Sequence, residues 1–268
     1  MLHNIGGISL KFELIKKLIL KVVVKIAKLH IFQKGFNYSQ DGPGNRLVYH
    51  LKGCNLRCPW CSNPEGMDVN RPVGYSASVD EVLKEVLRSA PMFFEGGGVT
   101  FTGGECTLQF DALKDILMLL KQNNINTAIE TNGTNKNLPE LFPFLDYLIM
   151  DLKHINEKTL KEVTGADLSV IKANILKAKE QNKRLFIRIP LINTFNADQK
   201  TVLEFLEYFK EINYENLSLE LLKYHEYGKD KWEQNGLTYK FKDGFVTDEF
   251  RKDFEEKLKQ INIKVIRT

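Results

Sequence analysis

Three of the four cysteines in this chain lie in one short stretch, Gly53 to Glu65, which reads GCNLRCPWCSNPE. Cys54, Cys58 and Cys61 are separated by three and then by two residues, so one loop can place three thiolates around a single centre. A closed structural zinc site and an ordinary four-cysteine cluster both need four ligands. The spacing therefore indicates a centre that is one protein ligand short of closure.

The spacing of the cysteines alone allows three interpretations of this loop. The first is an iron–sulfur cluster with one iron that has no protein ligand. The second is a zinc site, for which His50 or Cys106 would supply the fourth ligand. The third is a disulfide loop, which would leave one thiol over in a chain without a secretory signal. A second four-cysteine cluster is excluded, because only Cys106 remains outside the loop.

Length and charge favour an ordinary globular protein. The 268 residues suit one large domain, with or without an appendage, and the net charge of +4 is mild. Basic and acidic residues alternate along most of the chain, which is typical of solvated faces and predicts no nucleic-acid partner. Thiolates that must stay reduced predict a cytoplasmic protein.

The first thirty residues differ from the rest. From Ile8 to Ile31 the chain is apolar except for lysines that recur every three or four residues, which predicts a basic amphipathic helix. The lysines argue against a membrane span, and packing on the protein itself or on a partner is favoured over membrane contact. We therefore expect an N-terminal extension over residues 1–30 and one domain over residues 31–268.

After residue 31, short apolar runs alternate with helical patterns, as in repeated β/α units. Six such units predict an α/β fold, an incomplete (β/α)6 barrel of the TIM-like kind. The predicted strands are Arg46–Leu51, Val99–Thr102, Asn126–Glu130, Tyr147–Asp151, Leu185–Pro190 and Leu217–Leu222, with a closing strand at Ile263–Ile266. In barrels of this kind the chemistry lies at the carboxyl ends of the strands.

Polar motifs follow the predicted strands at that end. The cysteine loop follows the first strand, Gly103-Gly104-Glu105 the second, and Glu130-Thr131-Asn132 the third. Asp151 and Lys153 end the fourth, and His225 follows the sixth. Arg188 is a lone cation inside an apolar strand, so it must face a polar site or pair at its rim. This shared placement predicts one site, although each motif alone also has a structural reading.

Together these motifs resemble the radical S-adenosylmethionine enzymes, and within them the glycyl-radical-enzyme activating enzymes. The resemblance rests on Asp41-Gly42-Pro43-Gly44 with Arg46, on the cysteine loop, GGGVTFTGGE, ETNG and DLK, and on Arg188 and YHEYG with Lys231. It covers residues 31 to 231 in the family's order. It implies a radical S-adenosylmethionine type of partial barrel, a 4Fe-4S cluster, and S-adenosylmethionine bound at the open iron.

The resemblance also implies a role for each residue. Cys54, Cys58 and Cys61 would ligate the cluster, and Gly103, Gly104 and Glu105 would hold the methionine amino group. Lys153, His225, Asn132 and Arg188 would contact or adjoin S-adenosylmethionine, with Trp60 as a wall or a loop anchor. Glu130, Thr131 and Asp151 would match a monovalent-cation site, although the family more often has Asp at the position of Glu130. Asp41 to Gly44 would meet the partner's glycine loop.

The implied reaction is reductive cleavage of S-adenosylmethionine to a 5′-deoxyadenosyl radical, which takes hydrogen from a backbone glycine of a partner glycyl radical enzyme. A flavodoxin or ferredoxin-type protein would donate the electron. About a dozen residues without cysteine separate Glu65 from the helix that starts at Ser78, so an inserted ferredoxin-like domain is absent there and pyruvate formate-lyase is the favoured partner. The alternatives are a radical enzyme acting on a small molecule or peptide, and a non-catalytic iron–sulfur or zinc module.

Overall fold

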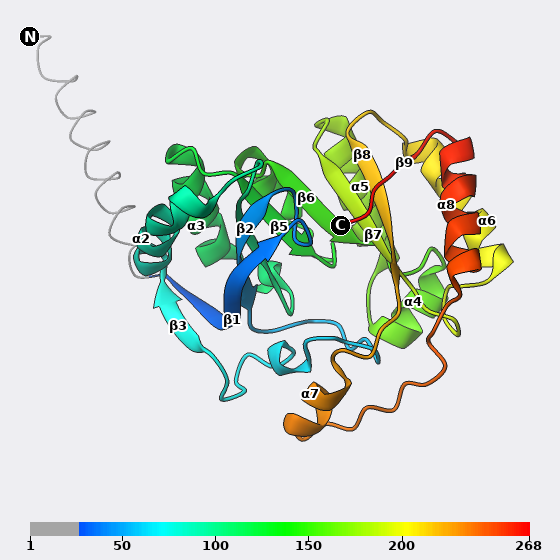
Figure 1. The fold of residues 1–268 in the computed structure, drawn as a ribbon, viewed down its shortest axis with the longest axis horizontal. Coiled ribbons are helices and arrows are strands. Elements are labelled where there is room, and N and C mark those ends of the chain that lie inside the picture. Colours follow the sequence, from blue (N-terminus) through cyan, green and yellow to red (C-terminus); the bar gives the residue numbers. More distant parts are fainter. Residues whose placement is uncertain (1–26) are drawn as a thin grey trace, which may run out of the picture.

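The computed structural model describes residues 27–268 and shows one sheet of nine strands in the order β3-β1-β2-β4-β5-β6-β7-β8-β9 (Figure 1). The six central strands run parallel. They are β2 (Asn45–Leu51), β4 (Gly98–Gly103), β5 (Thr127–Thr131), β6 (Tyr147–Asp151), β7 (Leu185–Leu191) and β8 (Leu217–Lys223). The two end strands of this order, β3 and β9, do not pair with each other. The predicted incomplete (β/α)6 barrel is confirmed.

Helices connect the parallel strands and lie along the outer side of the curved sheet (Figure 1). They are α2 (Val79–Ser89), α3 (Phe110–Gln122), α4 (Glu157–Thr164), α5 (Leu168–Glu180), α6 (Gln199–Ile212) and α8 (Asp248–Gln260). The short helix α7 (Lys229–Gln234) instead lies beside the cysteine loop (Figure 1). Short 3-10 turns lie at Pro64–Gly66 (η1), Ala90–Met92 (η2), Cys106–Gln109 (η3) and Leu138–Phe144 (η4). None of the helices within residues 27–268 is long and apolar enough to cross a bilayer.

The start of α2 shows how local sequence sets these elements. Ser78 Oγ accepts a hydrogen bond from the backbone N–H of Glu81 at 3.2 Å, and Glu81 Oε2 accepts one from the N–H of Ser78 at 2.7 Å. Two of the amide groups that a helix start leaves unpaired are thereby satisfied. The helix start predicted at Ser78 is confirmed.

An antiparallel pair that the sequence pattern does not reveal extends the sheet at its first edge. Strand β1 (Lys28–Tyr38) pairs with β2 and with β3 (Tyr75–Ser78), while β9 (Lys264–Val265) adds to β8 at the other edge. The helix predicted over residues 8–31 falls mainly on residues 1–26, outside the described residues. Its last four residues are strand, because Leu29 and Ile31 alternate into the core. The domain boundary placed at residue 30 therefore cuts into β1.

The central strands are buried on both faces, as parallel strands covered by helices usually are. Tyr49 of β2 stacks on Phe101 of β4 with 5.5 Å between ring centroids. Close packing of this kind leaves little freedom in the strands, so the loops at their carboxyl ends start from fixed points. The frame thus positions the site residues before any ligand is present.

The turn between β1 and β2 carries the DGPG motif and is tied to the sheet by Arg46. The guanidinium of this fully buried side chain donates to Thr100 Oγ1 at 2.7 Å, to the Val99 carbonyl at 2.8 Å and to the Pro43 carbonyl at 3.2 Å. Gly44 has a φ of +72°, and a Cβ there would lie 2.4 Å from the backbone nitrogen of Gly97. The turn is therefore held closely against the sheet.

Candidate active site

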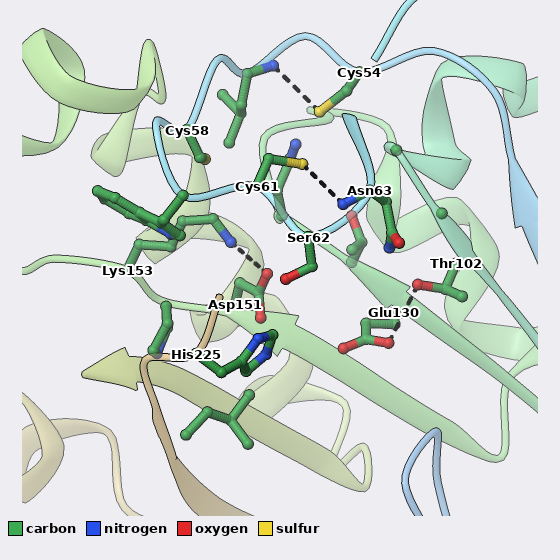
Figure 2. Close-up of a pocket in the computed structure, with 18 of the residues that line it drawn as sticks. Cys54, Cys58, Cys61, Ser62, Asn63, Thr102, Glu130, Asp151, Lys153 and His225 are labelled. Atoms are coloured by element: carbon green, nitrogen blue, oxygen red, sulfur yellow. Dashed lines mark hydrogen bonds and ion pairs between the residues drawn. The ribbon is translucent and has the colours of Figure 1, made fainter. Parts of the chain in front are cut away.

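Loops at the carboxyl ends of the parallel strands enclose a cavity of about 290 Å³ (Figure 2). Residues from all six central strands or from the loops that follow them line it. Of the predicted site residues, those that line it are Asp41, Cys54, Cys58, Trp60, Cys61, Gly103, Gly104, Glu130, Thr131, Asn132, Asp151, Lys153 and His225. The lining does not include Gly42, Pro43, Gly44, Glu105 or Arg188. The fold therefore brings most of the predicted residues to one place.

The cysteine loop covers one side of this cavity with three free thiols (Figure 2). The backbone N–H of Leu56 donates to Cys54 Sγ, and that of Asn63 donates to Cys61 Sγ, each at 3.4 Å. Burial raises the pKa of Cys58 to about 11 and that of Cys61 to about 12. Both would be protonated at neutral pH, so a metal centre that binds them must displace their protons.

His50 and Cys106 are the two candidates for a fourth ligand beside the three cysteines. His50 lines the same cavity, and the described residues 27–268 contain no preformed group of three or more His, Cys, Asp or Glu side chains arranged to hold a metal ion. Cys106 is fully buried outside the lining, with its Sγ donating to the Glu130 carbonyl at 3.4 Å.

Helix α7 holds the cysteine loop from outside, a contact that the sequence analysis did not predict. Trp232 Nε1 donates to the carbonyl of Cys61 at 2.9 Å, and Lys231 Nζ lies 2.8 Å from Glu65 Oε1. At Gly228, just before the helix, a Cβ would lie 2.6 Å from the Cα of Ser62, so only glycine allows this approach. A residue 171 positions away along the chain thus positions the third cysteine.

Trp60 packs against two aromatic rings while also lining the cavity. Its ring centroid lies 4.8 Å from that of Phe195 and 5.3 Å from that of Phe241. The ring thus forms part of the wall beside Cys58 and Cys61, and its two aromatic neighbours fix its position. Trp60 therefore makes the contacts expected of a cavity wall and also those expected of a loop anchor.

The glycine turn after β4 packs directly on the cysteine loop. The backbone N–H of Glu105 donates to the carbonyl of Gly53 at 2.7 Å, and that of Gly104 donates to the carbonyl of Leu51 at 2.9 Å. A Cβ on Gly104 would lie 2.3 Å from the oxygen of Gly53, and Gly103 has a φ of +119°. Side chains are excluded at both positions, so the backbone itself forms this part of the cavity wall.

The side chain of Glu105 points away from the cavity, contrary to the expectation that its carboxylate receives a ligand ammonium group. The side chain is almost fully buried, and Oε1 accepts hydrogen bonds from the Thr107 N–H, the Thr107 hydroxyl and the Thr131 hydroxyl. Oε2 accepts the N–H of Asn132 at 2.7 Å. Since four protein donors already satisfy this carboxylate, it braces the loops after β4 and β5 against each other.

Because Glu105 joins these two loops, removing its carboxylate should lower the stability of the protein. The variant Glu105→Ala would leave buried donors of Thr107, Thr131 and Asn132 without acceptors, a cost of about 3 kcal/mol, which lowers Tm by roughly 6–12 °C in a domain of this size. Glu105→Gln, which keeps one acceptor oxygen, should lose less. The measurement is thermal unfolding of the apoprotein. An unchanged Tm together with lost ligand binding would instead mean that the carboxylate acts on the ligand directly.

Asn132 and His225 line the cavity from opposite parts of the chain. Asn132 Nδ2 donates to Asn55 Oδ1 at 2.9 Å and so links the loop after β5 to the cysteine loop. His225 stacks on Tyr227, with 4.2 Å between ring centroids, and its Nδ1 lies 3.3 Å from the N–H of Tyr227. Burial lowers the pKa of His225, so the ring is neutral at neutral pH and can accept or donate one hydrogen bond.

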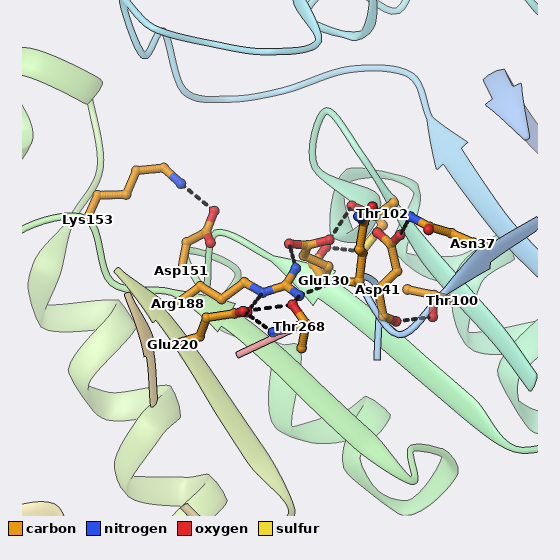
Figure 3. Close-up of polar contacts among 12 residues, drawn as sticks. Asn37, Asp41, Thr100, Thr102, Glu130, Asp151, Lys153, Arg188, Glu220 and Thr268 are labelled. Atoms are coloured by element: carbon orange, nitrogen blue, oxygen red, sulfur yellow. Dashed lines mark hydrogen bonds and ion pairs between the residues drawn. The ribbon is translucent and has the colours of Figure 1, made fainter. Parts of the chain in front are cut away.

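Two carboxylates of the cavity are paired with protein cations (Figure 3). Lys153 Nζ forms a salt bridge with Asp151 Oδ2. Burial opposes the charge of Lys153, but Asp151 and the nearby cysteines outweigh it and raise its pKa. Glu130 Oε1 lies 2.5 Å from Arg188 Nη1, and Glu130 Oε2 accepts the hydroxyl of Thr102 at 3.2 Å. The site is thus polar, but ion pairs between its own residues neutralise the charges of these two carboxylates.

Arg188 lies behind the cavity wall and makes contacts in four directions (Figure 3). Besides Glu130, it contacts Glu220 Oε2 at 2.9 Å through Nε, and through Nη2 the carbonyl of Gln40 and Thr268 Oγ1. Strands β5 and β8, the turn before β2 and the end of the chain therefore meet at the guanidinium of Arg188, which projects from β7. Because Arg188 does not line the cavity, it does not contact a ligand there directly.

Comparison with known proteins agrees with this geometry. Residues 48–222 match the model of the radical SAM superfamily. The pyruvate formate-lyase-activating enzyme of Clostridium pasteurianum is 38% identical over 226 residues, covering 82% of this chain and 93% of that protein. The crystal structure of a domain of pyruvate-formate lyase-activating enzyme from Bacteroides vulgatus ATCC 8482 matches with a TM-score of 0.53 at 26% identity, covering 63% of this chain and 98% of the other.

A further relative differs in length. The 4-hydroxyphenylacetate decarboxylase activating enzyme of Clostridioides difficile strain 630 is 29% identical over 273 residues, covering 78% of this chain and 86% of that protein. The alignment has more positions than this chain has residues, although it uses only part of the chain. The relative therefore contains residues for which this chain has no counterpart.

Proposed function

Because the chain belongs to the radical SAM superfamily and, within it, to the glycyl-radical-enzyme activating enzymes, we propose that it makes a glycyl radical on a pyruvate formate-lyase-like partner. The observation that supports this most strongly is the meeting of three free thiols, a backbone glycine wall, Lys153 and His225 around one cavity.

The donor set fits the cofactors that the family implies. Cys54, Cys58 and Cys61 would hold a 4Fe-4S cluster, and the N–H groups of Leu56 and Asn63 would donate to its sulfur ligands. When bound, the cluster would supply the one electron that cleaves a C–S bond of S-adenosylmethionine, which yields methionine and a 5′-deoxyadenosyl radical. The protein's own contribution is to hold these reactants in register and to keep water and oxygen away.

Different residues around the cavity would hold different parts of S-adenosylmethionine. The backbone at Gly103 and Gly104 leaves room for the methionine amino end beside the cysteine loop. Lys153 offers a fixed ammonium for the cofactor carboxylate, and Asp151 holds that ammonium in place. Trp60, Asn132 and His225 provide an aromatic face and hydrogen-bonding groups for the adenosyl part.

Asp41 is the part of the DGPG turn that reaches the cavity. Asn37 Nδ2 donates to Asp41 Oδ2 at 2.5 Å, and the hydroxyl of Thr100 donates to the Asp41 carbonyl at 2.7 Å. A glycine loop has no side chain at its reacting residue and can thread into a narrow site, where Asp41 would accept a backbone N–H. We therefore assign Asp41 to the partner, with Gly42, Pro43 and Gly44 shaping the turn.

The absence of an inserted domain favours pyruvate formate-lyase as the partner. Only eight residues separate η1, which ends at Gly66, from β3, which starts at Tyr75. The alignment with the decarboxylase activating enzyme contains residues missing here, whereas the alignment with the Clostridium pasteurianum enzyme uses 82% of this chain in 226 positions. A flavodoxin or ferredoxin-type protein would deliver the electron to the single cluster, in the cytoplasm, where thiols stay reduced.

The proposal is tested by electron paramagnetic resonance. The chain is reconstituted anaerobically with iron and sulfide and mixed with dithionite, S-adenosylmethionine and purified pyruvate formate-lyase. We expect a glycyl doublet on the lyase, and none on a lyase variant whose radical glycine is replaced by alanine. Cleavage of S-adenosylmethionine without a doublet on the lyase, but with one on a decarboxylase of the same class, would reassign the partner. Cleavage without a doublet on either would support a small-molecule or peptide substrate.

A further inference from the structure

The cation site implied by the resemblance does not match the contacts of its residues. Both carboxylate oxygens of Glu130 have protein donors, Arg188 Nη1 at 2.5 Å and the Thr102 hydroxyl at 3.2 Å. Thr131 Oγ1 donates to Glu105 at 2.7 Å and accepts the N–H of Gly133 at 3.1 Å. A hard metal ion is held by a shell of oxygen atoms that are free to face it. Three of the expected ligand oxygens therefore already have partners.

The guanidinium of Arg188 lies among the carboxylates that would have to bind such an ion. The residue is only 6% exposed, and its Nε forms a second salt bridge, at 2.9 Å, with Glu220. In the sheet register, Arg188 of β7 stands beside Asp151 of β6 and beside Glu220 of β8. Its positive charge thus lies among three carboxylates, with a position set by two neighbouring strands.

The length of the Glu130 side chain allows this contact. Glu130 stands on β5, and β6 lies between it and Arg188 in the sheet. Its side chain reaches the guanidinium while remaining 20% exposed in the cavity wall. An aspartate at the same position would be one methylene shorter and would draw its carboxylate back from Arg188.

We propose that Arg188, held against Glu130, serves as the permanent cation of this cofactor site, so that the protein binds and cleaves S-adenosylmethionine without a monovalent metal ion. The inference rests on the proposed function for its ligand. Arg188 is here a positioning residue, because it acts on the cavity through Glu130. A fixed guanidinium presents the same charge whatever ions the surrounding solution contains.

The first test measures S-adenosylmethionine cleavage in a tetramethylammonium buffer. Photoreduced deazaflavin replaces dithionite, since sodium dithionite would bring in an ion under test. At constant ionic strength, K⁺ or Na⁺ should change the rate of the unaltered protein by less than about twofold. Glu130→Asp should cleave more slowly in tetramethylammonium and gain about fivefold or more on addition of K⁺. Glu220→Asp, which shortens the other partner of Arg188 outside the cavity, should gain no such response.

A second test needs no catalysis. Equilibrium dialysis against radioactive Rb⁺, a stand-in for K⁺, is carried out on the reconstituted protein with S-adenosylmethionine. The unaltered chain should bind no Rb⁺ above background, and Glu130→Asp about one equivalent. Stoichiometric Rb⁺ on the unaltered chain, stimulation of that chain by K⁺ of about fivefold, or a Glu130→Asp variant indifferent to both ions would overturn the proposal. Failure of cleavage in every buffer would instead count against the proposed function, while the Rb⁺ result still stands.

Discussion

Replacing Cys58 by alanine should abolish reductive cleavage of S-adenosylmethionine. Cys58 is one of three thiols lining the cavity, and no other cysteine lines it. A cluster with only two cysteine ligands is not retained, so bound iron should fall from about four per chain to well below one, and 5′-deoxyadenosine should fall below detection. Iron and sulfide analysis after anaerobic reconstitution, followed by chromatography of the cleavage products, provides the measurement.

The matched control is Cys106→Ala. This thiol is fully buried behind the cavity wall, and its Sγ donates a hydrogen bond to the Glu130 carbonyl at 3.4 Å. Its loss removes a small buried group at a cost of about 1 kcal/mol and leaves the cluster in place. If Cys106→Ala lost the cluster while Cys58→Ala kept it, the assignment of ligands would be wrong.

The variant Arg188→Met should cause the largest loss of stability. It removes the cation but keeps an apolar stem, which leaves Glu130 and Glu220 facing each other without a counter-charge. Breaking a buried ion pair from one side usually costs about 3–5 kcal/mol, because the remaining charge stays buried. We expect a fall of that size in the free energy of unfolding, read from urea denaturation of the apoprotein.

Arg184→Met tests the same substitution four residues earlier. The Arg184 side chain is exposed and contacts Tyr147 through a hydrogen bond of 3.3 Å and the face of its ring, so the expected loss is about 0.5 kcal/mol or less. Adding Glu130→Gln to Arg188→Met should recover part of the lost stability, since it removes one unpaired charge. Equal stability of Arg188→Met and Arg184→Met would show that the buried carboxylates are neutralised in some other way.

Much of the frame could be predicted because strand periodicity is a local property. The apolar runs around Leu47 to Leu51 and Leu185 to Leu191 belong to strands covered on both faces, and the helices between them carry ordinary start signals such as Ser78. Parallel strands joined in this way must place their carboxyl ends together. The meeting of the cysteine loop with the motifs of the following strands was therefore predictable without coordinates.

The first edge of the sheet could not be predicted in this way. Strand β1 carries Lys28, His30 and Lys34 and has no sustained alternation, so its lysine spacing resembles that of the helical pattern before it. Its pairing with β3 joins residues 44 to 50 positions apart, from Ile31↔Tyr75 to Lys28↔Ser78, and depends on contacts that no local window contains. For this reason the helical pattern predicted over residues 8–31 runs on into the first residues of β1.

The directions in which side chains point also could not be predicted from the sequence. Glu105 stands in the predicted loop, but its carboxylate turns toward Asn132 and Thr131 because those donors lie behind the wall. Arg188 reads in the sequence as a cation beside the cofactor, whereas its partners come from β5 and β8. Trp232 gave no signal at all, since its bond to the Cys61 carbonyl depends on how a distant helix docks. Such partners follow from tertiary packing and not from motif spacing.

Isotope labelling follows the transfer of hydrogen from the partner's glycine to the adenosyl group. Pyruvate formate-lyase is prepared with deuterated glycine and incubated anaerobically with the reconstituted protein, a reductant and S-adenosylmethionine, and the nucleoside product is examined by mass spectrometry. We expect 5′-deoxyadenosine to gain one deuterium as the glycyl doublet appears. Unlabelled 5′-deoxyadenosine formed together with that doublet would contradict direct abstraction by the radical made in this cavity.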